Sequence, residues 1–179
     1  MLTERGGYGI RIFLIWSVEY EFEKREAMAP GGRKGQKEKR GGQGPWCIHF
    51  FQRPGGGAIP GRDFLDACPM KVRQTMLAVL KAVADAPPPA FSGGGYWEAM
   101  HDEMAGYYEI RVDGRDRRHY RLFCFLEREG KSLGLSGPSI VIIGGKDKPF
   151  RTTLSKRDYE QVRALGDEYR SRTPRSVAT

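Results

Sequence analysis

The sequence lacks the features of a membrane protein, a disulfide-bonded protein and a metal protein. No apolar run reaches the ~18 residues of a membrane-spanning helix, and segment 10–18 is interrupted by Arg11 and lacks a signal-peptide cleavage site. The three cysteines form no C-x-x-C pair, which indicates free thiols in a reducing cytosol. The three histidines lack metal-ligand spacing. We therefore expect a cytoplasmic protein with no membrane segment and no metal or cofactor.

Positive charge is what the sequence has in excess. Its 179 residues contain 30 Lys and Arg against 22 Asp and Glu, a formal net charge of +8. This balance favours a polyanionic partner such as nucleic acid, or an acidic protein. The length is sufficient for one domain plus an arm or tail.

The two ends of the chain differ in composition from its middle. Residues 1–26 hold one apolar segment followed by an alternating one, which fits a strand or hairpin, or upstream sequence without a stable fold. Residues 27–45 are rich in glycine and basic side chains and predict a flexible basic linker. We expect one folded domain over 46–170 and a frayed polar tail over 171–179.

Residues 46–170 alternate between strand and helix patterns. The predicted strands are 46–51, 106–112, 119–126 and 139–143, and residues 144–153 read as a cation-rich loop. The predicted helices are 62–67, 70–84 and a last one from the N-cap Ser155 to about Arg170, with Asp158 as the reciprocal acid. The fold class is therefore α+β: a small, twisted, antiparallel-rich sheet of about four strands. An N-terminal helical hairpin packs on one face and a C-terminal helix completes the domain.

Two arginines meet across the hairpin of strands 106–112 and 119–126. A turn centred near Asp116 places Arg111 directly opposite Arg121 on one face, where like charges repel and a bound anion such as polyphosphate relieves the cost. A turn centred half a residue away places the two side chains on opposite faces. The spacing alone leaves both arrangements open.

The order of elements resembles the RelE/ParE toxin superfamily, and its HigB and phage Gp49-like branch in particular. The resemblance rests on the order and spacing of segments 64–73, 108–111, 119–123, 140–148 and 155–160, and it covers about two-thirds of the chain. There are departures. Gly144 and Gly145 stand where the family often has His-Gly, residues 151–155 replace the usual Lys-Thr-Pro, and 134–137 is an insertion-like loop. Residues 1–45 have no counterpart in the family.

The resemblance implies the toxin of a type II toxin–antitoxin pair. Such toxins cleave mRNA, usually on the ribosome, without a metal and with a 2′,3′-cyclic phosphate product. The implied partners are therefore mRNA, the ribosome and a cognate antitoxin, typically a helix-turn-helix protein or an acidic segment.

The implied site residues are all cationic or ionisable. Arg111 and Arg121 are expected to clamp the scissile phosphate, and Lys146 and Lys148 to add charge from the loop. His119 is the acid/base candidate, because the pKa of an imidazole lies nearest neutrality. The candidate RNA-binding residues are Lys71, Arg73, Arg115, Arg117, Arg118 and Arg151.

Two other functions compete with the nuclease. A ParE-like protein with the same fold poisons DNA gyrase and cleaves nothing. A prophage-derived module that has lost its toxicity only binds its partner, and the missing Lys-Thr-Pro element is compatible with that interpretation.

Overall fold

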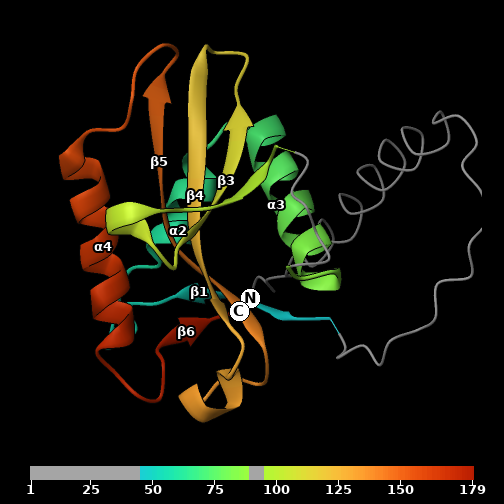
Figure 1. Cartoon of the computed structure of the whole chain (residues 1–179), viewed down its shortest axis with the longest axis vertical. Helices are drawn as coiled ribbons and strands as arrows, with labels where there is room; N and C mark the ends of the chain where they lie inside the picture. The colour runs from blue at the N-terminus through green and yellow to red at the C-terminus, as the bar shows by residue number, and fades with distance from the viewer. Residues whose placement is uncertain (1–44, 89–94) are drawn as a thin grey trace, which may run out of the picture. The chain divides into compact units, whose positions relative to one another are not determined.

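The computed structural model describes residues 45–88 and 95–179, which belong to one compact unit, Gln43–Thr179. The element predicted within 1–26 and the predicted linker up to residue 44 lie outside the described residues. The strands are β1 Cys47–Phe51, β2 Trp97–Ala99, β3 Tyr108–Asp113, β4 Arg118–Glu127, β5 Ser139–Pro149 and β6 Val177–Ala178. The helices are α2 Pro60–Ala67, α3 Met70–Asp85 and α4 Lys156–Arg170, with short 3₁₀ turns at Asp102–Met104 and Gly130–Leu133 (Figure 1).

The strands form one sheet in the order β2-β3-β4-β5-β1-β6. Every neighbouring pair is antiparallel except β1 and β5, which run parallel. The predicted α+β class is confirmed, but the prediction of about four strands is wrong because the sheet has six. The two extra strands, β2 and β6, are three and two residues long, too short to show a periodic pattern.

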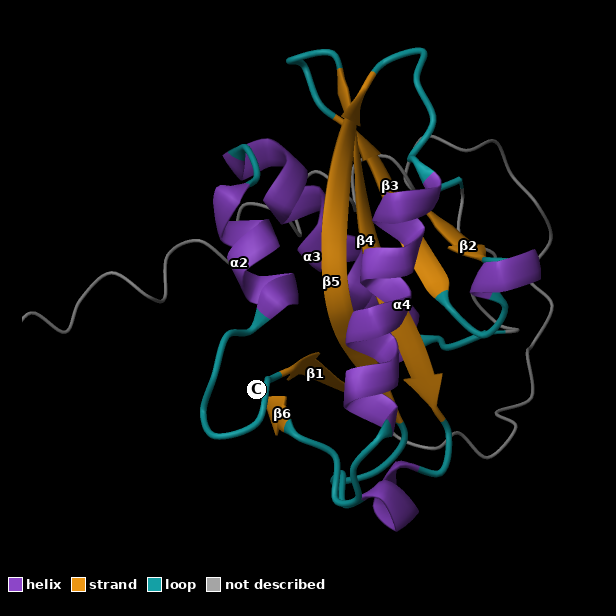
Figure 2. Cartoon of the chain, turned by 90° about the vertical axis from the view of Figure 1, so that its left-hand side faces the viewer, coloured by secondary structure: helices purple, strands orange, loops and turns teal. Residues whose placement is uncertain are grey.

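Helices cover both faces of the sheet. The predicted helical hairpin, α2 and α3, packs on one face against side chains such as Ile110, Leu122 and Ile140. Helix α4 packs on the other face against Tyr107, Phe123 and other side chains of opposite parity. Figures 1 and 2 show α3 and α4 on opposite sides of the central strands. We call these the α3 face and the α4 face.

Local sequence accounts for where the helices lie. In α3 the predicted apolar stripe is buried against the sheet, with Met76, Leu80 and Val83 fully enclosed. Helix α4 begins at the predicted capping box: the Ser155 hydroxyl accepts the Asp158 N–H at 3.2 Å, and the Asp158 carboxylate accepts the Ser155 N–H at 2.9 Å. Such a cap stabilises a helix by about 1 kcal/mol.

Strand β5 continues six residues beyond its predicted end. It runs to Pro149, whereas the sequence predicts a loop from Gly144 onwards. The two glycines that suggest a break lie where helices pack closely on the strand. A Cβ on Gly145 would lie 2.0 Å from the Phe64 ring, and one on Gly144 would lie 3.1 Å from Leu165. The loop prediction is therefore wrong, and the lysines that follow lie on a strand.

The C-terminal segment is ordered by contacts with the rest of the unit. The sequence predicts a frayed tail over 171–179, but β6 pairs with β1 and the Arg62 side chain donates to the Thr179 carbonyl at 2.6 Å. The Arg175 guanidinium donates to the carbonyl oxygens of Arg170 and Arg172, which satisfies acceptors at the end of α4. The pairing with β1 and the contact with Arg62 are long-range, so the polar composition of residues 171–179 does not predict them.

No helix within 45–88 and 95–179 has both the length and the apolar character needed to cross a bilayer.

Candidate functional site

Two rows of polar side chains cross the α4 face at one end of the sheet. In the first row Arg111 of β3 pairs with Arg121 of β4, which pairs with Lys146 of β5. In the second, Asp113, His119 and Lys148 are paired in the same way. Residues two apart on a strand share a face, so both rows share the α4 face with Phe123, a buried contact of α4. We call these two rows the charged end of the α4 face.

The pairing of Arg111 with Arg121 resolves the alternative that the spacing left open. The two side chains lie on one face, as a turn centred near Asp116 requires. Lys146 and Lys148 were expected to approach from a loop; they lie on β5, directly opposite Arg121 and His119. The structure therefore brings together the five residues predicted as catalytic.

The anion between the two arginines belongs to the chain itself. Glu109 is 2% exposed, and its carboxylate accepts Arg111 Nε at 2.5 Å and Arg121 Nη1 at 2.8 Å. A buried carboxylate without a partner is costly, so two guanidinium groups stabilise its charge. Glu98 of β2, directly opposite Glu109, forms a further ion pair with Arg111. Neither carboxylate is among the site residues that the sequence predicts.

The remaining cations differ in how they are paired. Lys146 lies 3.5 Å from the Asp158 carboxylate of α4 and donates to Gln161. Lys148 instead donates to the backbone carbonyl of Thr152. Desolvation lowers the pKa of Lys148, and the neighbouring Arg121 lowers it further. Lys148 is thus a cation that can release a proton more easily than a free lysine.

His119 is held from two sides. Its Nδ1 lies 2.5 Å from the carboxylate of Asp113, and its ring stacks on Phe150 with centroids 4.4 Å apart. A carboxylate at Nδ1 favours the tautomer with the proton on that nitrogen, so Nε2 can accept one. Asp113 is not among the predicted site residues, although the hairpin register that pairs Arg111 with Arg121 also pairs Asp113 with His119.

The predicted RNA-binding residues separate into two groups. Lys71, Arg115, Arg117 and Arg151 are exposed. The Phe150 N–H donates to the Arg117 carbonyl at 2.9 Å, so the β3–β4 turn and the turn after β5 are adjacent.

The other two are held in ion pairs on or near the α3 face. Arg118 pairs with Asp147, and Arg73 of α3 pairs with Asp66 of α2. Because successive strand residues alternate, Arg118 points away from His119 and Arg121. The structure therefore does not bring Arg118 and Arg73 to the charged end. Their positions in the sequence do not show this, because the ion-pair partners come from other elements.

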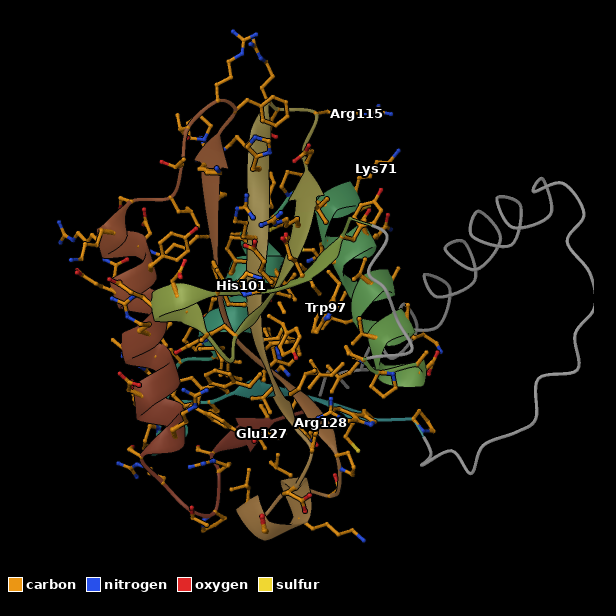
Figure 3. All side chains as sticks on the ribbon, viewed as in Figure 1. Lys71, Trp97, His101, Arg115, Glu127 and Arg128 are labelled. Carbon is orange, nitrogen blue, oxygen red and sulfur yellow. The ribbon has the colours of Figure 1, made fainter. Side chains whose placement is uncertain are left out.

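A groove runs from the charged end around the edge of β3. It has a volume of about 830 Å³, and its lining includes Lys71, Tyr96, Arg111, Arg115, His119 and Arg121. Lys71 and Arg115 lie at the same end of the molecule (Figure 3). At this edge β2 pairs with β3 as far as Ile110, and the Arg111 N–H donates to the Tyr96 carbonyl at 2.8 Å.

Within the described residues, no group of three or more His, Cys, Asp or Glu side chains is placed to hold a metal ion. Cys47, Cys68 and Cys124 are free thiols, as their number and spacing predict.

Comparisons with known proteins give limited information. No family model matches the chain, and no curated protein matches it. The toxin–antitoxin complex RelBE2 from Mycobacterium tuberculosis is one similar solved structure, with a TM-score of 0.37 and 15% sequence identity. The similarity covers 58% of this chain and 99% of that chain. A similarity of this size assigns neither a family nor an activity.

Proposed function

We propose that this chain is a RelE-like toxin of a toxin–antitoxin system, and that the charged end of the α4 face cleaves RNA. The observation that carries the proposal is the pair of rows on β3, β4 and β5. They place an oriented imidazole, a lysine of lowered pKa and two arginines on one face. Acid–base groups beside fixed cations are what phosphodiester cleavage by an internal 2′-hydroxyl requires.

In the proposed reaction His119 Nε2 accepts the proton of the 2′-hydroxyl. The 2′-oxygen attacks the adjacent phosphorus, and the bond from phosphorus to the 5′-oxygen breaks. Lys148 gives a proton to the departing 5′-oxygen, which leaves a 2′,3′-cyclic phosphate and a free 5′-hydroxyl. A base and an acid placed in this way each contribute about 10²- to 10⁴-fold.

Arg121 is the residue best placed to stabilise the pentacoordinate phosphorane. One of its terminal nitrogens is bound to Glu109, and its Nε is buried without a hydrogen-bond partner among the described residues. A guanidinium fixed before the substrate binds does not reorganise when charge develops. A single donor of this kind contributes about 3 kcal/mol to a transition state.

A second candidate function is a protein-binding toxin without nuclease activity, such as a ParE-like gyrase poison, or an inactive binding module. The observation that favours it is the neutralisation of the arginines by Glu109 and Glu98, which gives them a structural role without substrate. For any of these functions, the net charge of +8 suits an acidic or helix-turn-helix antitoxin as partner.

The test is to induce the full chain in cells and map transcript 5′ ends by primer extension. We expect new cuts in mRNA with the wild type, none with Arg121→Ala, and wild-type cuts with Lys131→Ala. Lys131 is an exposed control on the 3₁₀ turn Gly130–Leu133. A DNA-damage response without mRNA cuts identifies the gyrase poison, and unaffected growth identifies the inactive module.

A further inference from the structure

The two carboxylates that bind Arg111 differ sharply in their surroundings. The side chain of Glu109 is 3% exposed and bridges Arg111 to Arg121, whose side chain is 16% exposed. The side chain of Glu98 is 48% exposed and contacts Arg111 alone, among the ion pairs of the described residues. Yet the two residues are direct partners across β2 and β3. The two carboxylates are therefore neighbouring negative charges, one buried and one exposed.

Burial makes the Glu109 contacts permanent. Removing one partner from a buried, hydrogen-bonded ion pair leaves an uncompensated charge, so the network stays together when a ligand arrives. Its geometry sets both guanidinium groups side by side despite their mutual repulsion. Glu109 therefore fixes where the outer nitrogens of Arg111 and Arg121 lie.

Exposure makes the Glu98 contact exchangeable. An ion pair on the surface contributes at most about 1 kcal/mol, because water solvates both partners well when they separate. Glu98 holds Nη1 of Arg111, whereas the other two nitrogens of that guanidinium face Glu109. A phosphate that approaches Nη1 of Arg111 therefore competes with Glu98 for that nitrogen, while Glu109 stays in place.

The geometry points to a divided role for the two carboxylates: Glu109 positions the arginine pair for an RNA phosphate, and Glu98 competes with that phosphate for Arg111. This inference rests on the proposed function, because it takes RNA as the ligand. It makes Glu109 a positioning residue that raises affinity and Glu98 an intramolecular competitor that lowers it. Neither role follows from the net charge of the site.

Matched substitutions separate this inference from plain electrostatics. Glu98→Gln and Glu109→Gln each remove one negative charge from directly paired positions, so charge alone predicts that both tighten RNA binding. We expect opposite signs. Glu98→Gln should tighten binding about two- to fivefold. Glu109→Gln should weaken it by about tenfold or more, and Glu109→Asp, which keeps the charge, should recover part of the loss.

The measurement is fluorescence anisotropy of the full chain with a fully 2′-O-methylated oligoribonucleotide, at one salt concentration. This probe has the RNA backbone but no attacking hydroxyl, so binding is read without cleavage. Circular dichroism checks that each variant is folded. If Glu109→Gln fails to fold, Glu98→Gln and Glu109→Asp still give the two opposite shifts.

Three outcomes overturn the inference. Shifts of the same sign for the two Gln variants, or weaker binding by Glu98→Gln, overturn it while the proposed function stands. A wild type that binds no RNA overturns both. In a cleavage assay, Glu98→Gln should lower KM and leave kcat unchanged, whereas Glu109→Gln should reduce kcat/KM, a division that a purely structural role does not produce.

Discussion

The two halves of the α4 face are built on the same three strands and differ in what covers them. In one half, Tyr107, Phe123 and Phe125 are buried beneath α4 together with its own Val162 and Tyr169. In the other, the same strands present the charged end, where Lys146 contacts Asp158 and Gln161 near the start of α4. The apolar half provides stability and the charged half is available for a ligand, because a helix covers only part of the strands that it packs on.

The largest effect is expected in the apolar half. Phe123 is fully buried and packs against Tyr159 of α4. Phe123→Ala should lower the free energy of unfolding by about 3–5 kcal/mol, measured by urea denaturation. His119→Ala, four residues away on the same face, should change it by less than about 1 kcal/mol because the ring is partly exposed. An equal loss of unfolding free energy in Phe123→Ala and His119→Ala would contradict this division and show that the two halves form one core.

The charged half should show the reverse pattern, a loss of activity without a loss of stability. His119→Ala and His119→Gln should both reduce RNA cleavage about a hundredfold or more, measured as single-turnover rates on an oligoribonucleotide. Glutamine can hydrogen-bond to Asp113 but cannot transfer a proton at neutral pH, so the two variants should agree. Cleavage by either at the wild-type rate would remove the acid–base role of His119.

On its way from the apolar half to the charged half, β5 passes close to the Phe64 ring of α2 at Gly145. Gly145→Ala places a Cβ 2.0 Å from the Phe64 ring, so either the ring or the strand must move. We expect a loss of about 1–3 kcal/mol in the free energy of unfolding. Gly137→Ala is the matched control, because a Cβ there meets nothing within 4 Å. A neutral Gly145→Ala would mean that the close contact does not fix the path of β5.

The smallest effect is expected at the junction of the two halves, where α4 begins. Ser155→Ala removes the N-cap and should cost about 1 kcal/mol. The hydrogen bonds from Ser155 lower the pKa of Asp158 below its usual 3.8, and Lys146 lowers it further. The stability from this group is therefore present above about pH 4 and is lost as pH falls through the lowered pKa. Thermal melts of the wild type and Asp158→Asn from pH 2 to 7 should converge at the acid end.

The sequence predicted the elements with strong local patterns. The stripe of α3, the capping box of α4 and the alternation along β3 placed these elements to within two residues. Local pattern failed where long-range contacts decide the outcome. Gly144 and Gly145 suggest the end of a strand, because the sequence does not show the helices that pack closely on both sides of them. Strand β6 has only two residues, too few to form a recognisable strand pattern.

By itself the sequence determined the α+β class, the free cysteines, and the presence of arginine and histidine on neighbouring strands, because these follow from composition and from the period of each element. The tertiary structure decided the rest of the site. Only pairing across strands shows Arg111 opposite Arg121, Glu109 buried between them and Asp113 on His119. A side chain gains its partners from residues that are distant in sequence, and the burial that sets their energies exists only once the sheet has formed.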